Sequence, residues 1–96
     1  MQNTVIDLQS RPALAPRVRL QIDKVDGGPV LLYPEGLLKL NETAHEILSR
    51  CDGRATVAEI IALLDSEYEV GADTLRADVV ECLAQFQRQQ LVIFTA

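Results

Sequence analysis

The stretch V-L-L-Y-P-E-G-L-L-K-L-N, from Val30 to Asn41, decides how this chain folds. It holds two short apolar segments on either side of Pro34-Glu35-Gly36, a triplet that favours a tight turn, and so it predicts a β-hairpin. Asn41 follows directly, and its side-chain oxygen can cap the first turn of a helix. A sheet of two or three strands cannot close into a barrel, so we expect one edge to stay open. An extended peptide is the natural partner of an open edge.

The residues before this stretch predict one more strand. Val18, Leu20 and Ile22 alternate with polar residues, which is typical of a half-buried strand. The segment Asp26-Gly27-Gly28-Pro29 then favours a reversal, because glycine admits positive φ and proline cannot continue a ladder. Residues 1–16 are polar and contain two prolines, and we expect them to form a flexible N-terminal arm before a single domain at 17–96. The expected antiparallel strands are residues 17–22, 30–33 and 37–40.

Downstream of the hairpin, the apolar residues change from a period of two to a helical period. They recur at spacings of three and four in three segments, which predicts helices at about residues 42–51, 57–68 and 74–89. Thr56 and Glu59 have the spacing of a capping box, which begins the second helix. The predicted fold class is therefore α+β: a small three-stranded antiparallel sheet followed by a three-helix bundle, in a winged helix-turn-helix-like layout.

The charge of the chain argues against nucleic acid as a partner. The 96 residues carry a formal net charge of −5 at pH 7, whereas binding to phosphates relies on clustered Lys and Arg. The third expected helix would read DNA in a winged-helix protein, yet Asp73, Asp78 and Glu81 at its start and within it outnumber Arg76 and Arg88. The winged helix-turn-helix-like layout nevertheless leaves a DNA-binding or transcription-regulatory module as the alternative function. No apolar stretch is long enough for a membrane span and no secretory signal begins the chain, so we expect a cytoplasmic protein without membrane contact.

The sequence offers little that could perform chemistry. Its only histidine, His45, lies beside the apolar stripe of the first expected helix, and Cys51 and Cys82 are too few to ligate zinc. Phosphate-binding glycine loops and nucleophile motifs are absent from the sequence. We therefore expect no catalytic residue, no metal and no cofactor. Both cysteines are predicted to be small buried residues, and the alternative, a disulfide, would be unusual in a reducing compartment.

The candidate site is a groove between the open strand and the third helix. The strand offers main-chain donors and acceptors to any guest, and the helix offers apolar contacts. The alternative is that the leucines belong to the core, and spacing alone does not separate the two readings. If the groove reading holds, Val79→Asp abolishes peptide binding in a variant that still folds. The predicted peptide-binding residues are Leu37, Leu38, Lys39 and Leu40 on the strand and Leu75, Arg76, Val79 and Leu83 on the helix.

Four segments resemble the pyrroloquinoline quinone (PQQ) biosynthesis protein D family, PqqD. They are R-P-A-L-A-P-R-V-R-L at 11–20, V-L-L-Y-P-E-G-L-L-K-L-N at 30–41, E-I-L-x-x-C-D-G at 46–53 and T-V-A-E-I at 56–60. The resemblance implies a peptide chaperone that binds a precursor peptide (PqqA-like) and presents it to a radical S-adenosylmethionine enzyme (PqqE-like). It also implies that the peptide adds as a strand beside the third strand, against the third helix. The open edge further permits a weak or strand-exchanged homodimer.

Overall fold

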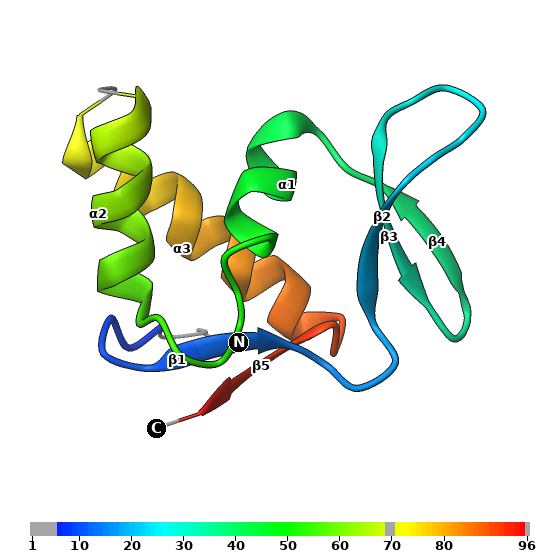
Figure 1. The fold of residues 1–96 in the computed structure, drawn as a ribbon. Coiled ribbons are helices and arrows are strands. Elements are labelled where there is room, and N and C mark those ends of the chain that lie inside the picture. The colour runs from blue at the N-terminus through cyan, green and yellow to red at the C-terminus, as the bar shows by residue number, and fades with distance from the viewer. Residues whose placement is uncertain (1–5, 69–70, 96) are drawn as a thin grey trace.

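A three-helix layer and two small β-sheets make up the fold (Figure 1). The computed structural model describes residues 6–68 and 71–95, apart from the side chain of Ala72. The sheet of β2, β3 and β4 stands on one side of the helices, and β1 and β5 run together beneath them (Figure 1). The predicted α+β class, with a three-stranded antiparallel sheet and three helices, is confirmed. The elements are β1 (Arg11–Leu14), β2 (Arg19–Ile22), β3 (Pro29–Tyr33), β4 (Gly36–Lys39), α1 (Glu42–Leu48), α2 (Val57–Tyr68), α3 (Ala72–Arg88) and β5 (Val92–Thr95).

The hairpin predicted in the stretch from Val30 to Asn41 forms β3 and β4. Tyr33 lies opposite Gly36, so Pro34 and Glu35 make a two-residue connection. The order of the sheet is β2-β3-β4, and both pairs are antiparallel. The first strand of the sheet begins at Arg19 and not at residue 17, because Arg17 has a φ of 69°. A positive φ cannot continue an extended strand.

The second sheet joins segments from the two ends of the chain. Residues 11–14, which we expected inside a flexible arm, form β1 and pair antiparallel with β5, with Arg11 opposite Thr95. The other side of this segment is also bonded, since the carbonyl of Pro12 accepts from the N–H of Gly53 at 2.9 Å. Sequence periodicity misses such a strand because it is short, contains proline and pairs with residues far along the chain. Residues 1–5 of the expected arm lie outside the described residues.

Caps that the sequence predicts begin the first two helices. The Asn41 side chain accepts a hydrogen bond from the N–H of Ala44 at 2.7 Å, an interaction worth about 1 kcal/mol. Thr56 and Glu59 form the reciprocal capping box, with N···O distances of 2.8 and 3.1 Å. Helix α1 ends at Leu48, earlier than the expected residue 51, because the chain turns there through i→i−3 bonds. Helix α3 spans 72–88 where 74–89 was expected.

The apolar stripes of the helices meet the inner face of β3 in one core. Leu31 of β3 is fully buried and contributes the centre of the sheet's inner face. This packing fixes the sheet against the helices, since either layer alone would expose its hydrophobic residues. Within the described part of the chain, no helix combines the length and apolarity that a bilayer crossing requires. The largest helix side chains that are fully buried are Ile47, Leu48, Val57, Ile60, Leu64, Val79 and Leu83.

Candidate functional site

Strand β4 is an open edge of the three-stranded sheet. It lies at the end of the strand order and pairs only with β3. The N–H of Leu40 donates to the carbonyl of Pro29 at 3.0 Å, and antiparallel pairing alternates along a strand. The backbone groups of Leu37 and Lys39 therefore point away from β3. No backbone hydrogen bond from elsewhere in residues 6–68 and 71–95 reaches them.

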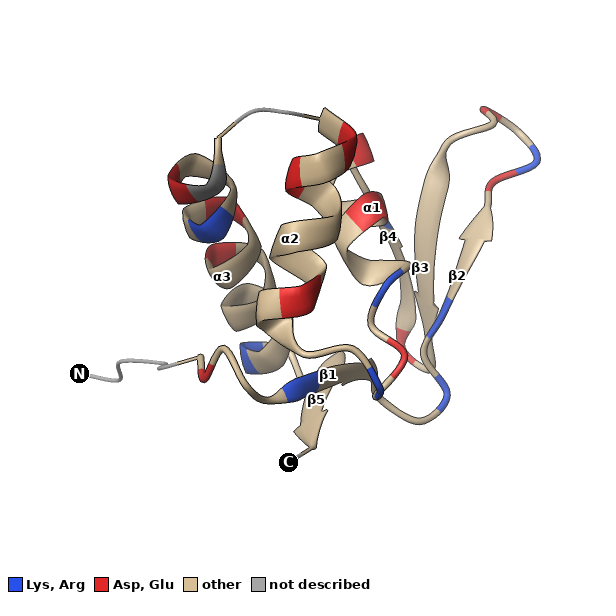
Figure 2. Ribbon diagram, turned by 60° about the vertical axis from the view of Figure 1, so that its left-hand side comes forward, with Lys and Arg blue, Asp and Glu red and all other residues tan. Residues whose placement is uncertain are grey.

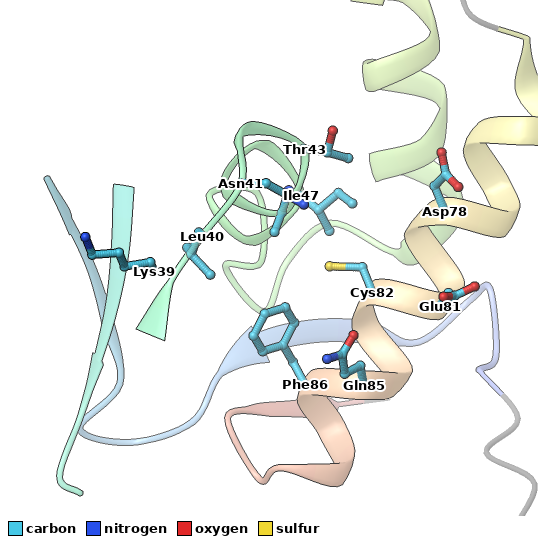
Figure 3. A pocket seen from close by; sticks show the side chains of 11 residues that line it. Lys39, Leu40, Asn41, Thr43, Ile47, Asp78, Glu81, Cys82, Gln85 and Phe86 are labelled. Atoms are coloured by element: carbon cyan, nitrogen blue, oxygen red, sulfur yellow. The ribbon is translucent and has the colours of Figure 1, made fainter. Parts of the chain in front are cut away.

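A cavity of about 410 Å³ separates the end of β4 from α3, and the start of α1 closes its upper side (Figure 3). We call this cavity the β4–α3 groove. Figure 3 shows the Leu40 and Phe86 side chains directed toward each other across it, with Cys82 between α1 and α3. The strand side carries Lys39, and the helix side carries acidic residues. The lining residues are Lys39, Leu40, Asn41, Thr43, Ala44, Ile47, Asp78, Glu81, Cys82, Gln85 and Phe86.

The strand residues of the predicted site lie on β4 or, for Leu40, directly after it. Leu37 is 46% exposed, and Lys39 is exposed at the groove. Leu38 and Leu40 are half-buried and pack against the core. A further cavity of about 500 Å³ lies at the other end of the strand, where Leu38 meets Tyr33 and the residues that follow α3. The inner side of β4 is thus hollowed at both ends.

The helix half of the predicted site lies mainly in the core. Leu75, Val79 and Leu83 all belong to the core cluster, and Val79 and Leu83 are 0% exposed. The core alternative that the spacing left open therefore holds for these three side chains. A charge at Val79 would be buried, so Val79→Asp is expected to unfold the protein and not to leave it folded. Arg76 is exposed and does not line the groove.

Sequence reasoning missed the residues that α3 does present to the groove. They lie one position before the buried stripe on the helix: Asp78, Cys82 and Gln85. A mixed row of acid, thiol and amide has no periodic apolar signal, so the hydrophobic pattern selected the stripe that faces the core. Phe86 belongs to the buried stripe and is only 8% exposed, yet it also lines the groove. Its position at the edge of the stripe was the signal available.

Comparison with protein families decides the relationship. A family model described as coenzyme PQQ synthesis protein D (PqqD) matches residues 28–92, about two thirds of the chain. The chain belongs to the PqqD family. A PqqA binding protein of Xanthomonas oryzae is 38% identical over 87 residues, which cover 91% of this chain and 95% of the relative. A PqqA binding protein of Klebsiella pneumoniae is 50% identical over 66 residues, 68% of this chain and 70% of that protein.

Two solved structures of PqqD proteins resemble this fold. One is the solution structure of the PqqD truncation of Methylobacterium extorquens PqqCD, described as a stand-alone recognition element for ribosomally synthesized and post-translationally modified peptides. Its TM-score is 0.81 at 31% identity, over 94% of this chain and 96% of that chain. The crystal structure of PqqD from Xanthomonas campestris has a TM-score of 0.57 at 33% identity, over 91% of this chain and 97% of that chain.

The thiols of this PqqD chain are poor nucleophiles. Burial raises the pKa of Cys82 to about 11, and burial together with the neighbouring Cys82 raises the pKa of Cys51 to about 12. Both cysteines are free. Because the thiolate is the reactive form, a groove that contains Cys82 in its protonated form suits contact and not bond formation.

An ion pair ties the open strand to the loop between β2 and β3. The Lys39 Nζ lies 2.8 Å from Asp26 Oδ2. The hydrogen bond from Lys39 lowers the pKa of the Asp26 carboxyl, and the same bond raises the pKa of Lys39. Both side chains are exposed, so the pair adds little to the stability of the fold. The ion pair instead fixes the position of the Lys39 side chain, which it holds beside the loop between β2 and β3.

Proposed function

We propose that this PqqD protein is a non-catalytic chaperone that binds the precursor peptide of PQQ and presents it to a radical S-adenosylmethionine enzyme. The observation that carries the proposal is the open edge of β4 beside the β4–α3 groove. The relatives are named PqqA binding proteins, and the M. extorquens domain is described as a peptide recognition element. Both descriptions support a peptide as the guest.

The guest would add to the sheet as a strand. It would exchange main-chain hydrogen bonds with Leu37 and Lys39, whose N–H and C=O groups face outward. Each such bond contributes only about 1 kcal/mol net, whereas ordering a disordered peptide costs about 1–2 kcal/mol per residue. The ladder alone therefore cannot hold the guest.

Apolar contact in the β4–α3 groove supplies the remaining free energy. Leu40 and Phe86 line its apolar part, next to Cys82. Burial of apolar surface contributes about 25 cal/mol per Å², so one leucine- or phenylalanine-sized side chain of the guest adds about 2 kcal/mol. The strand edge then sets the direction and register of the peptide, and the groove sets its affinity.

Presentation requires no chemistry from the chaperone. Holding the guest on one face raises its effective concentration at an enzyme that binds another face. Helix α2 lies on the side of the molecule away from β4 (Figure 2) and would provide such a face. A protein with this role needs to bind its guest tightly enough for capture and loosely enough for release.

An NMR titration of the ¹⁵N-labelled protein with its synthetic precursor peptide tests the proposal. We expect amide shifts along β4, at Leu37 and Lys39, and on α3 from Asp78 to Phe86. A scrambled peptide of the same composition is the matched control and should leave these signals in place. Shifts confined to α2 or β5 would contradict strand addition at β4. Shifts produced by random duplex DNA at low salt would favour the winged-helix DNA-binding alternative.

A further inference from the structure

A second cavity adjoins the β4–α3 groove and has no part in the proposed strand addition. It has a volume of about 400 Å³ and lies where the start of α1, the end of α2 and the start of α3 meet. We call it the three-helix pocket. Ile47, Leu64 and Leu75 line it, and all three are core residues. Tyr68, which is 51% exposed, also lines it. The three core side chains are at most 6% exposed, so Tyr68 is the apolar side chain of the lining that is most open to solvent.

The rim of the three-helix pocket is acidic. Its described lining residues include Glu42, Glu46 and Asp78 but no Lys or Arg. Glu46 is paired with Arg50 at 2.9 Å, whereas Glu42 and Asp78 have no ion-pair partner within residues 6–68 and 71–95. Figure 2 shows acidic residues on all three helices. Partial burial raises the pKa of Tyr68, and the nearby charges of Glu46 and Glu67 raise it further. The apolar pocket therefore has a rim that favours a cation.

The pocket adjoins the β4–α3 groove. Thr43, Ile47 and Asp78 line both cavities, and Figure 3 places Thr43 and Asp78 on the side of the groove nearest α2. A peptide paired with β4 passes Lys39 at the end of the strand and meets the start of α1 next. Because the two cavities share three lining residues, a chain that leaves β4 at this end reaches the three-helix pocket next.

We propose that the three-helix pocket binds the segment of the guest next to the one paired with β4, and that it selects a large apolar side chain flanked by Lys or Arg. This inference rests on the proposed function and adds a specificity element to it. Apolar contact with Tyr68, beside the buried Leu64 and Leu75, retains the segment. The carboxylates of Glu42 and Asp78 attract a positive charge next to that side chain. The described lining holds no Lys or Arg that would repel such a charge.

Fluorescence anisotropy with a labelled full-length precursor peptide tests this inference. Tyr68→Ser should weaken binding about tenfold, because it removes apolar surface from the pocket. The matched control is Leu63→Ser, since Leu63 lies on the same helix, is 49% exposed and lines neither cavity. It should leave the affinity unchanged. Circular dichroism of both variants confirms that each is folded.

The charge of the rim has its own test. Glu42→Gln should weaken binding about threefold at low salt and less at high salt, because partly exposed charge pairs are screened. Asp73→Asn is the matched control, an exposed acid of α3 outside both cavities. A peptide whose Lys and Arg are replaced by Gln should bind the wild-type protein and Glu42→Gln equally well.

Three outcomes separate this inference from the proposed function. If wild-type protein binds the peptide, an edge variant of β4 does not, and Tyr68→Ser binds as well as wild type, the inference is wrong and strand addition stands. If wild-type protein does not bind the peptide, both fall. Tyr68→Ser could instead weaken binding of the radical enzyme, or self-association, while binding of the peptide stays unchanged. The pocket then has another occupant and the inference is also wrong.

Discussion

Helix α3 presents two faces that differ in composition although their residues are adjacent in the sequence. Val79 and Leu83 are fully buried in the core, whereas Asp78 and Cys82, one position earlier, line the β4–α3 groove. The first face holds the fold together and the second is free to meet a guest. The difference teaches that hydrophobic periodicity finds the face a helix needs for folding and not the face it uses for binding.

Val79→Asp gives the strongest test of the buried face. A carboxylate at a fully buried position would be unpaired, so we expect it to destabilise the fold by about 4 kcal/mol or more. Loss of the cooperative urea transition, followed by circular dichroism, is the measurement. A folded Val79→Asp variant that merely fails to bind peptide would show that the buried face meets the guest after all.

Cys82→Asp tests the groove face of the same helix. Cys82 is half-buried and opens into the groove, so we expect a folded variant that binds the precursor peptide at least about tenfold more weakly, because the guest must desolvate a new charge. Calorimetric titration measures the affinity. Cys82→Ser keeps the volume and adds no charge, and it should bind nearly as wild type does. Equal affinities for the Asp and Ser variants would remove the groove from the site.

Lys39→Pro tests the open strand. Proline removes the outward N–H of this residue while the hydrogen bonds to β3 remain, and proline is tolerated on such an edge. Loss of one ladder bond should weaken peptide binding about fivefold. Lys39→Ala is the matched control, since it removes the ion pair with Asp26 but keeps the N–H. If the two variants bind alike, the guest does not pair at this position.

The two cysteines extend the comparison to pH. Burial raises the pKa of the core thiol of Cys51 from its ordinary value of 9.0 to about 12. Between pH 9 and pH 12 the thiol keeps its proton in the folded protein and loses it in the unfolded chain. The stability that depends on this proton is therefore complete below pH 9 and declines as the pH rises toward 12. At pH 10 the loss is about 1 kcal/mol. Urea unfolding at pH 7 and pH 10 should show a smaller decrease for Cys51→Ala than for wild type; equal decreases would contradict this account.

The parts of the fold that follow from local chemistry could be predicted from the sequence. The turn at Pro34-Glu35, the cap at Asn41 and the capping box from Thr56 to Glu59 each depend on residues within a few positions of one another. The pairing of Arg11 with Thr95 depends on residues 84 positions apart, and no local pattern reports it. Residues 11–14 form a strand because β5, from the far end of the chain, pairs with their backbone.

The candidate site also has one half that local sequence predicts and one half that it does not. The strand half was predictable, because a small sheet must leave an edge and the alternation of Leu37 to Leu40 places it. The helix half was not, because the helix residues in the groove have no common chemical character. Only the relative rotation of α3 and the sheet shows that Cys82 and Gln85 face the strand. Rotation of a helix about its axis is a property of the packed structure.

The pairing of β1 with β5 brings residues from near both ends of the chain to one corner of the molecule, away from β4 (Figure 1). A carrier protein or a reporter tag joined after β5 would therefore start from that corner and would leave the peptide path clear.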